Sequence, residues 1–354
     1  MSVAKLRVAI IGAGAVALDA HLPAWLSRSD SVVVAVADPM AEALAATAAW
    51  RDVRRRVADY RLLLDDREID VVDICAPSAL HAAMATQALE AGKHVLCEKP
   101  MATTRAGAAS MLDAARRTGR KLMIAQVLRF EPGVVQLHEH LSGKPLGDVY
   151  YTRCQYLRRR RLPPRPGFTD RSLSGGGALM DLGAHLLDLA WWMIDCPTPV
   201  TVSGAAFNYL ARRGDLGGEW GGWDAATVDV EDFAVGMVRF ENGTILVIET
   251  SWLGFQPERE MWRIDWFGSR AGARWPQCQV FGERDRQPWD VALPQPSGFP
   301  SHAPLIDQFV RHVLDDMPPP IALWQTVTTT AMLEALYESS RQRREVAVEA
   351  FSPC

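Results

Sequence analysis

The first 125 residues alternate short, continuous apolar runs with helix-like segments. Continuous apolar strands separated by helices are typical of a parallel sheet that is covered on both faces, so the pattern predicts an α/β domain over residues 1–125. The expected strands are Leu6–Ile11, Val32–Ala37, Val71–Cys75, His94–Cys97 and Leu122–Ala125. The expected helices are Ala15–Leu26, Ala79–Ala91 and Thr103–Thr118, with an alanine-rich stretch at Met40–Trp50.

The pattern changes after about residue 126, where longer strands follow one another with few helices between them. Asn242-Gly243 is a strong hairpin signal between two of these strands. We therefore predict a second domain over residues 126–354, with a large, open, mostly antiparallel sheet and a last helix, 323–341, able to pack back on the first domain. The expected strands are Val149–Leu157, Val200–Tyr209, Val228–Phe240, Thr244–Trp252, Met261–Phe267 and Ala271–Arg274, and the other helices are Ala178–Ile194 and Ala303–Asp315.

Composition narrows the function classes. The 354 residues carry 38 Lys and Arg against 42 Asp and Glu, a net charge of −4 that gives nucleic acid no general attraction. No apolar run approaches the roughly 18 residues of a membrane span, and the first residues suit a strand and turn better than a signal peptide. Six scattered cysteines without a CxxC pair indicate a reducing, cytoplasmic setting, with neither a disulfide framework nor a zinc site.

A glycine turn follows the first strand and opens the first helix, in the sequence G12-A-G-A-V-A17. In a dinucleotide fingerprint Gly12 permits the tight turn, Gly14 lets the backbone approach a pyrophosphate, and Ala17 permits close packing of the helix. Asp38 ends the second strand, where a carboxylate binds ribose hydroxyls and repels a 2′-phosphate, so NAD is favoured over NADP. The alternative is a non-binding α/β domain in which Asp38 caps a helix. The expected cofactor contacts in this turn are Gly12, Ala13, Gly14, Ala15 and Val16.

Further loops leave the carboxyl ends of the predicted parallel strands, where ligands bind in open α/β sheets. Lys99 follows one such strand, and a lysine there can hydrogen-bond a substrate hydroxyl as that hydroxyl loses its proton. The equally weighted alternative is a surface lysine paired with Glu98. The cofactor contacts expected in these loops are Ala76, Pro77, Ser78, His81, Glu98, Lys99 and Gln126.

The helix expected from Ala178 carries Asp181 and His185, which are four residues apart and so share one face. Such a pair can bind one hydroxyl and accept its proton, although a buried structural pair is the alternative. Gly175–Gly177 would make a flexible entry to this helix. His138 and His140 form an HxH pair that we interpret as solvent-facing, and no metal site is expected.

These motifs occur in the order found in the Gfo/Idh/MocA family, that of glucose–fructose oxidoreductase and inositol dehydrogenase. The resemblance rests on the glycine turn, on APSALH at 76–81, on CEKP at 97–100 and on GGGALMDLGAH at 175–185. It implies a Rossmann domain, then an α/β domain whose open sheet commonly forms the interface of a homodimer or homotetramer. It also implies that Lys99 contacts the reacting hydroxyl, that His185 is the general base, and that Asp181 orients substrate and histidine.

A narrower likeness, over residues 156–170 and 221–233, is to D-glucoside 3-dehydrogenases. It implies an NAD-dependent sugar dehydrogenase that oxidises a secondary hydroxyl, best the 3-hydroxyl of a glycoside or aminoglycoside, to a ketone. Two alternatives stay open: an NAD-retaining glycosidase that acts by transient oxidation and elimination, and a non-catalytic NAD-binding protein. The acids that would suit an amino sugar, unless they are merely solvated turn acids, are Glu219, Asp224, Asp229, Glu231 and Asp232.

Overall fold

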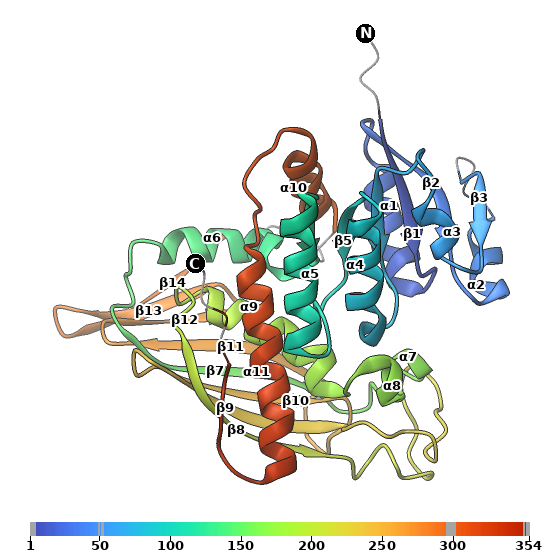
Figure 1. The fold of residues 1–354 in the computed structure, drawn as a ribbon. Coiled ribbons are helices and arrows are strands. Elements are labelled where there is room, and N and C mark those ends of the chain that lie inside the picture. The colour runs from blue at the N-terminus through green and yellow to red at the C-terminus, as the bar shows by residue number, and fades with distance from the viewer. Residues whose placement is uncertain (1–4, 49, 51–52, 295–301, 350, 352–354) are drawn as a thin grey trace. The chain divides into compact units, whose positions relative to one another are not determined.

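The chain forms two compact units (Figure 1). The computed structural model describes residues 5–48, 50, 53–294, 302–349 and 351. The first unit comprises Met1–Ala102, Ala106–Val127 and Pro300–Thr326. The second comprises Thr103–Arg105, Leu128–Phe299 and Val327–Cys354.

A six-stranded parallel sheet forms the centre of the first unit, in the order β3-β2-β1-β4-β5-β6. Its apolar strands are buried on both faces, and Val8, Ala9 and Ile10 have no exposed surface. The strand order reverses between β1 and β4, which is where ligands bind in open sheets of this kind. The strands are β1 (Leu6–Ile11), β2 (Ser31–Ala37), β3 (Arg55–Val57), β4 (Val71–Ile74), β5 (His94–Cys97) and β6 (Leu122–Ile124).

The helices of the first unit follow its strands, as the sequence pattern predicts. The first helix begins as a π-turn, η1 (Ala17–His21), and continues as α1 (Leu22–Leu26). The others are α2 (Ala41–Ala46), α3 (Arg61–Leu64), η2 (Ser78–Leu80), α4 (His81–Glu90), α5 (Arg105–Thr118) and α10 (His302–Leu314). Strand β3 and helix α3 have no counterpart among the predicted elements.

Helix α10 belongs to the first unit although it lies far along the chain. The Phe309 ring on its buried face lies 6.3 Å from the Trp25 ring, and Asp307 accepts a hydrogen bond from Arg28 at 2.9 Å. The division of the chain therefore differs from the predicted single boundary after residue 125, since residues 300–326 return to the first unit. Helix α11 (Leu323–Gln342) lies mostly in the second unit.

The second unit is built on a nine-stranded sheet in the order β14-β13-β12-β11-β7-β10-β9-β8-β15. Most neighbouring pairs are antiparallel, and β10 runs parallel to β7. The predicted hairpin at Asn242-Gly243 joins β9 to β10, with Gly243 at φ 86°. The strands are β7 (Val149–Arg158), β8 (Pro199–Phe207), β9 (Phe233–Phe240), β10 (Ile245–Ser251), β11 (Glu260–Gly268), β12 (Ala271–Trp275), β13 (Gln279–Arg284), β14 (Gln287–Ala292) and β15 (Val346–Ala347).

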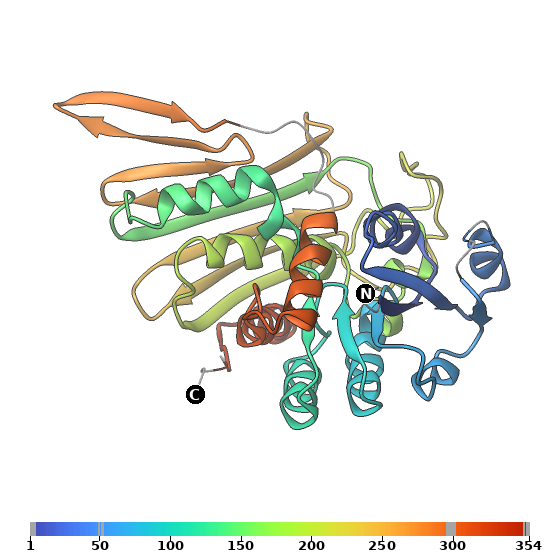
Figure 2. The same ribbon diagram turned by 90° about the horizontal axis from the view of Figure 1, so that it is seen from above.

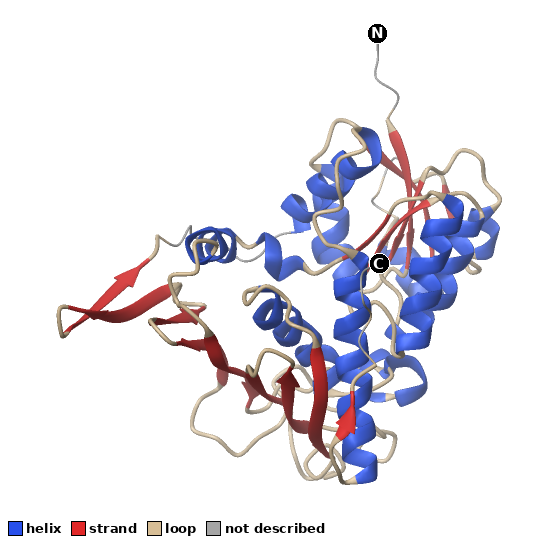
Figure 3. Cartoon of the chain, turned by 60° about the vertical axis from the view of Figure 1, so that its left-hand side comes forward, coloured by secondary structure: helices blue, strands red, loops and turns tan. Residues whose placement is uncertain are grey.

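Helices of the second unit gather on one face of its sheet, where Figures 2 and 3 show α6 and α9. The indole N–H of Trp266 on β11 donates to Ala190 O at 3.1 Å, which fixes α9 on this face. Tyr151 and Phe267 neighbour Thr152 and Trp266 along β7 and β11, so they lie on the opposite face, with ring centroids 5.4 Å apart. The helices are η3 (Val127–Phe130), α6 (Pro132–Leu141), α7 (Pro166–Thr169), α8 (Arg171–Ser174), η4 (Leu179–Gly183) and α9 (Ala184–Trp192).

These two sheets confirm the predicted fold class, a parallel α/β domain followed by a domain with a mostly antiparallel sheet. Among the described residues, no helix has the length and apolar character to span a membrane. Cys75, Cys97 and Cys154 are buried, and burial raises the pKa of the Cys75 thiol to about 12, as befits a small core residue. Cys354 lies outside the described residues.

Candidate active site

The glycine turn of the first unit is shaped for close approach. Gly12 has φ 95°, and a Cβ there would lie 2.6 Å from Cys75 O, so only glycine fits. A Cβ on Gly14 would instead meet nothing within 4 Å, which leaves open space beside the start of the helix. Ala17 has no exposed surface and lets η1 approach the sheet closely.

Asp38 is fastened to this turn. One oxygen of its carboxylate accepts a hydrogen bond from Ala13 N–H at 2.8 Å, and the other accepts one from Met40 N–H at 2.8 Å. Strand β2 ends just before Asp38, so the parallel register of β1 and β2 brings this carboxylate to the glycine turn. A carboxylate fixed in this way is an acceptor for further hydroxyl donors.

His81 joins two loops at the carboxyl edge of the sheet. Its Nδ1 lies 2.8 Å from Pro100 O, and its Nε2 lies 2.8 Å from Ala76 O. Burial lowers the pKa of His81, and a neutral ring donates only one of these two hydrogen bonds. Both ring nitrogens thus face the backbone, and His81 holds the loops that carry Ala76, Pro77, Ser78 and Lys99.

Glu98 is buried rather than paired with the Lys99 side chain at the surface. Its carboxylate lies 2.9 Å from His21 Nε2 and 3.2 Å from His302 Nε2, and it accepts a hydrogen bond from Lys99 N–H at 3.0 Å. Burial alone would raise the pKa of Glu98, but the hydrogen bonds from the two histidines hold it well below its usual range. Lys99 is half-buried, and Gln126 is buried after β6.

In the second unit, Asp181 and His185 lie on one continuous helix. Asp181 belongs to the π-turn η4 and His185 to the first turn of α9, in place of the single α-helix predicted over Ala178–Ile194. Such π-turns are rare and are frequent at functional sites. Both residues are partly exposed, whereas Leu182, Leu186 and Leu189 on the same helix are buried.

The entry to this helix is tightly packed, so the predicted flexible glycine segment is wrong. A Cβ on Gly177 would lie 1.9 Å from Glu231 O, and one on Gly176 would lie 2.1 Å from the Tyr337 hydroxyl. The Glu231 carboxylate accepts hydrogen bonds from Gly177 N–H and Leu179 N–H, both at 2.9 Å, and thereby caps η4. The three glycines are needed here for close packing.

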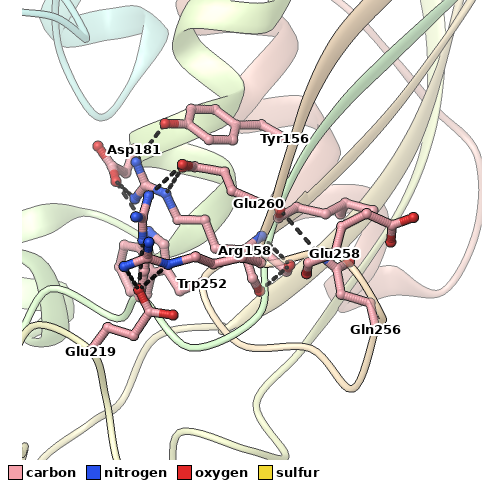
Figure 4. A network of polar contacts seen from close by, with 12 residues as sticks. Tyr156, Arg158, Asp181, Glu219, Trp252, Gln256, Glu258 and Glu260 are labelled. Carbon is pink, nitrogen blue, oxygen red and sulfur yellow. Dashed lines mark hydrogen bonds and ion pairs between the residues drawn. The ribbon is translucent and has the colours of Figure 1, made fainter.

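The Asp181 carboxylate has a hydrogen-bond donor and an ion-pair partner beside it. Trp252 Nε1–H donates to it at 3.1 Å, and an Arg158 guanidinium nitrogen lies 3.9 Å away (Figure 4). Arg158 also donates to the Tyr156 hydroxyl at 2.6 Å and to Glu260 at 3.1 Å, and its guanidinium is 4.8 Å from the Trp220 ring. The Trp252 hydrogen bond thus orients the Asp181 carboxylate, and Arg158 contributes a positive charge nearby.

Arg158, Trp252 and Glu260 are residues that the sequence analysis missed. Arg158 ends β7, Trp252 follows β10, and Glu260 begins β11, so neighbouring strands bring them together. The run of arginines at 158–161 was the available signal, but nothing in it distinguishes the nearly buried Arg158 from exposed neighbours.

Two of the five acids predicted to form a rim for an amino sugar are buried. Glu231 and Asp232 are 3% and 1% exposed, and Asp232 accepts hydrogen bonds from Leu210 N–H and Ala211 N–H. Hydrogen bonds from Arg259 and Arg161 lower the pKa of Glu219 to about 2. Asp224 and Asp229 accept hydrogen bonds from the backbone at Ala226 and Arg171. Glu231 and Asp232 therefore serve the fold, whereas Asp224 and Asp229 stay exposed and can accept further hydrogen bonds.

Two other polar residues near this helix have structural partners. Asp188 is buried and forms a bidentate ion pair with Arg129 at 2.6 and 2.8 Å. His140 is exposed as predicted, but His138 stacks on Trp192 with ring centroids 3.8 Å apart, so its solvent-facing assignment is wrong. The HxH spacing reveals nothing of a partner ring on another helix.

Comparison with known proteins gives this geometry a family. Residues 6–126 match the oxidoreductase family with an NAD-binding Rossmann fold, GFO_IDH_MocA, and residues 134–285 match the GFO/IDH/MocA C-terminal domain. The chain belongs to the GFO/IDH/MocA family. It is therefore an NAD(P)-dependent oxidoreductase, with NAD as the cofactor.

Individual relatives cover most of the chain. It is 33% identical to D-glucoside 3-dehydrogenase of Escherichia coli K12, over 88% of this chain and 89% of that one. It is 32% identical to levoglucosan dehydrogenase of Pseudarthrobacter phenanthrenivorans, over 62% and 58% of the two chains. Among solved structures, an oxidoreductase domain protein from Kribbella flavida has a TM-score of 0.84 at 25% identity, covering 98% of this chain and 99% of that one.

The first unit of this GFO/IDH/MocA protein fits the cofactor. Open space at Gly14 lies where a helix N-terminus attracts a pyrophosphate, and Asp38 offers a fixed carboxylate for ribose hydroxyls. These residues would hold NAD, which when bound supplies the hydride acceptor.

Asp38 should decide cofactor choice. We expect NAD to bind at least about tenfold more tightly than NADP, or roughly 1.4 kcal/mol, because a 2′-phosphate would face the carboxylate. Asp38→Ser should narrow the ratio of the two dissociation constants, measured by titration. It should also weaken NAD itself, because the Ala13 N–H loses its acceptor. The matched control is Asp65→Ser, an exposed carboxylate outside the turn, and equal wild-type affinities would contradict the assignment.

Proposed function

We propose that the protein is an NAD-dependent sugar dehydrogenase that oxidises the 3-hydroxyl of a glycoside to a ketone. The observation that carries the proposal is the 33% identity to a D-glucoside 3-dehydrogenase over 88% of the chain. The presence of Lys99, Asp181 and His185 at the motif positions supports a catalytic rather than a binding role.

Each of the three side chains has a distinct part in this chemistry. Asp181 accepts a hydrogen bond from a sugar hydroxyl, and the Trp252 indole N–H orients its carboxylate. His185, one helical turn further on, takes the proton of the reacting hydroxyl, and Lys99 stabilises the oxygen as its negative charge develops. The reacting carbon would give up a hydride with both bonding electrons, which NAD would accept when bound, so that a secondary alcohol would become a ketone with one proton left on the base.

The proposal is for neutral glycosides. The support for amino sugars is weaker, because two of the five loop acids, Glu231 and Asp232, are buried and bind backbone N–H groups. An exposed ammonium–carboxylate pair would in any case contribute only about 0–1 kcal/mol. We expect a neutral glucoside to react at least as well as its amino analogue.

The test is incubation with NAD and a panel of glycosides, with NADH followed by absorbance and the product by mass spectrometry and NMR. We expect NADH to accumulate with methyl glucosides and a ketone at C3. The matched control is the 3-deoxy glucoside, which lacks only the reacting hydroxyl and should give no NADH. A ketone at C2, C4 or C6 would reject the regiochemistry. Glycoside cleavage without NADH would identify an NAD-retaining glycosidase, and NAD binding without either reaction would identify a non-catalytic protein.

We also propose that the protein assembles into a homodimer or homotetramer through the open face of its nine-stranded sheet. Tyr151 and Phe267 contribute apolar surface to this face. Asp265 there is 1% exposed and neutralised by Arg153 and Arg274 at 2.8 and 2.6 Å, which lowers the cost of covering it. The oligomer size stays a prediction.

A further inference from the structure

His21 has no exposed surface and lies between two carboxylates in the core of the first unit. Its Nδ1 is 2.8 Å from Asp73 Oδ2, and its Nε2 is 2.9 Å from Glu98 Oε1. A neutral imidazole has one N–H and can donate to only one of these oxygens. Two such short contacts therefore require one more proton in the group.

The surrounding donors locate that proton on the ring. Trp25 Nε1–H, which can only donate, points at Asp73 Oδ2 from 2.7 Å, and Lys99 N–H points at Glu98 Oε2 from 3.0 Å. Asp73 Oδ2, the oxygen that faces His21, thus acts as an acceptor, and Glu98 Oε1 faces the Nε2 atoms of both His21 and His302, an arrangement that favours two carboxylates and an imidazolium. The other titratable groups near it are Cys75, which directly follows β4, and His302 on α10, whose Nε2 is 3.2 Å from Glu98 Oε1. Burial lowers the pKa of His21, but the Asp73 carboxylate raises it well above its ordinary value.

This arrangement links the cofactor helix to the turn that carries Lys99. His21 ends η1, the helix that the glycine turn opens, whereas Glu98 and Lys99 follow β5. The Glu98 carboxylate that His21 fixes is the same group that holds the Lys99 backbone N–H. His81 fastens the next carbonyl, that of Pro100, so the turn is held on both sides of Lys99.

We propose that His21 is a positioning residue, an imidazolium clamped between Asp73 and Glu98 that fixes the Glu98–Lys99 turn and so aims the Lys99 amine. The effect on turnover rests on the proposed function, in which Lys99 contacts the reacting hydroxyl. The clamp itself is a property of the fold of the first unit and can be measured without a substrate.

Two variants separate the two contacts of the ring. His21→Gln puts its amide N–H₂ near the Nε2 position and keeps a donor for Glu98, whereas His21→Asn puts it near Nδ1 and keeps a donor for Asp73 only. His21→Asn should lower kcat about tenfold to 100-fold with little change in the dissociation constant of NAD, since misplacing a catalytic group by about 1 Å has effects of that size. His21→Gln should retain most of the turnover.

The hydrogen-exchange rate of the Lys99 backbone N–H, measured by NMR, reports how firmly the turn is held and needs no substrate. It should be about fivefold to tenfold faster in His21→Asn and close to wild type in His21→Gln, because only the first loosens the acceptor of that N–H. Equal exchange in wild type and His21→Asn would overturn the proposal. If the wild type oxidises no sugar, the proposed function fails while this measurement still decides the clamp.

The protonation state of His21 can be measured on the wild-type protein, so this test is still available if neither variant folds. NMR of ¹⁵N-labelled histidines should show both ring nitrogens of His21 carrying protons at neutral pH. Zinc ions should leave these signals unchanged, because the ring nitrogens hold protons and not a metal. An unprotonated ring nitrogen, or its capture by zinc, would overturn the proposal.

Discussion

Replacing His185 by asparagine should lower kcat about 10²-fold to 10⁴-fold, the usual span for a general acid–base group. Asparagine keeps a polar side chain on the same face of α9 but cannot take up the proton of a hydroxyl near neutral pH. The dissociation constant of NAD should change little, because the variant leaves the predicted cofactor contacts, the glycine turn and Asp38, unchanged. Single-turnover kinetics with saturating NAD and a methyl glucoside would measure the loss.

The matched control for this variant is His140→Asn, which makes the same replacement on the exposed side of α6. It should leave kcat unchanged. Thermal unfolding of both variants would separate a chemical loss from a folding defect. Turnover near that of the wild type in His185→Asn would contradict the assignment of the base and direct attention to Lys99.

The features that the sequence predicts well are those fixed by local chemistry. Gly12 needs a positive φ and a close approach to β4, and these demands appear directly as a glycine after a buried strand. Continuous apolar runs predict the parallel sheet for the same reason, since both faces of each strand are covered. The hairpin at Asn242-Gly243 is likewise a local signal.

Features that depend on tertiary contacts are not visible in the sequence. Glu231 reads as one more loop acid until the fold brings it to the N–H groups of Gly177 and Leu179. Arg158 is one of four consecutive arginines, and only the strand order of the sheet brings it to Asp181 and Glu260. Helix α10 returns to the first unit because of its contact with Trp25, which no pattern along the chain encodes.

One further part of the candidate site is the turn that contains Glu98 and Lys99. From the sequence alone, Lys99 is equally well interpreted as a surface residue paired with Glu98, because adjacent opposite charges are common. In the structure the Glu98 carboxylate contacts the Nε2 atoms of His21 and His302, so it has partners other than the Lys99 side chain. Glu98 accepts the hydrogen bond of the Lys99 backbone N–H. This favours a role for the Lys99 amine other than an ion pair with Glu98.

Lys99→Ala should therefore lower kcat about 10²-fold to 10⁴-fold, because the developing negative charge on the reacting oxygen loses its cationic donor. Lys99→Arg keeps the charge but changes the reach and direction of the donors, so its turnover should lie between those of wild type and Lys99→Ala. Lys5→Ala, an exposed lysine in the same unit, is the matched control and should have no effect. Added methylamine should restore part of the turnover of Lys99→Ala only. A wild-type rate in Lys99→Ala, or rescue by methylamine of His185→Asn as well, would show that the amine does not act at the reacting oxygen.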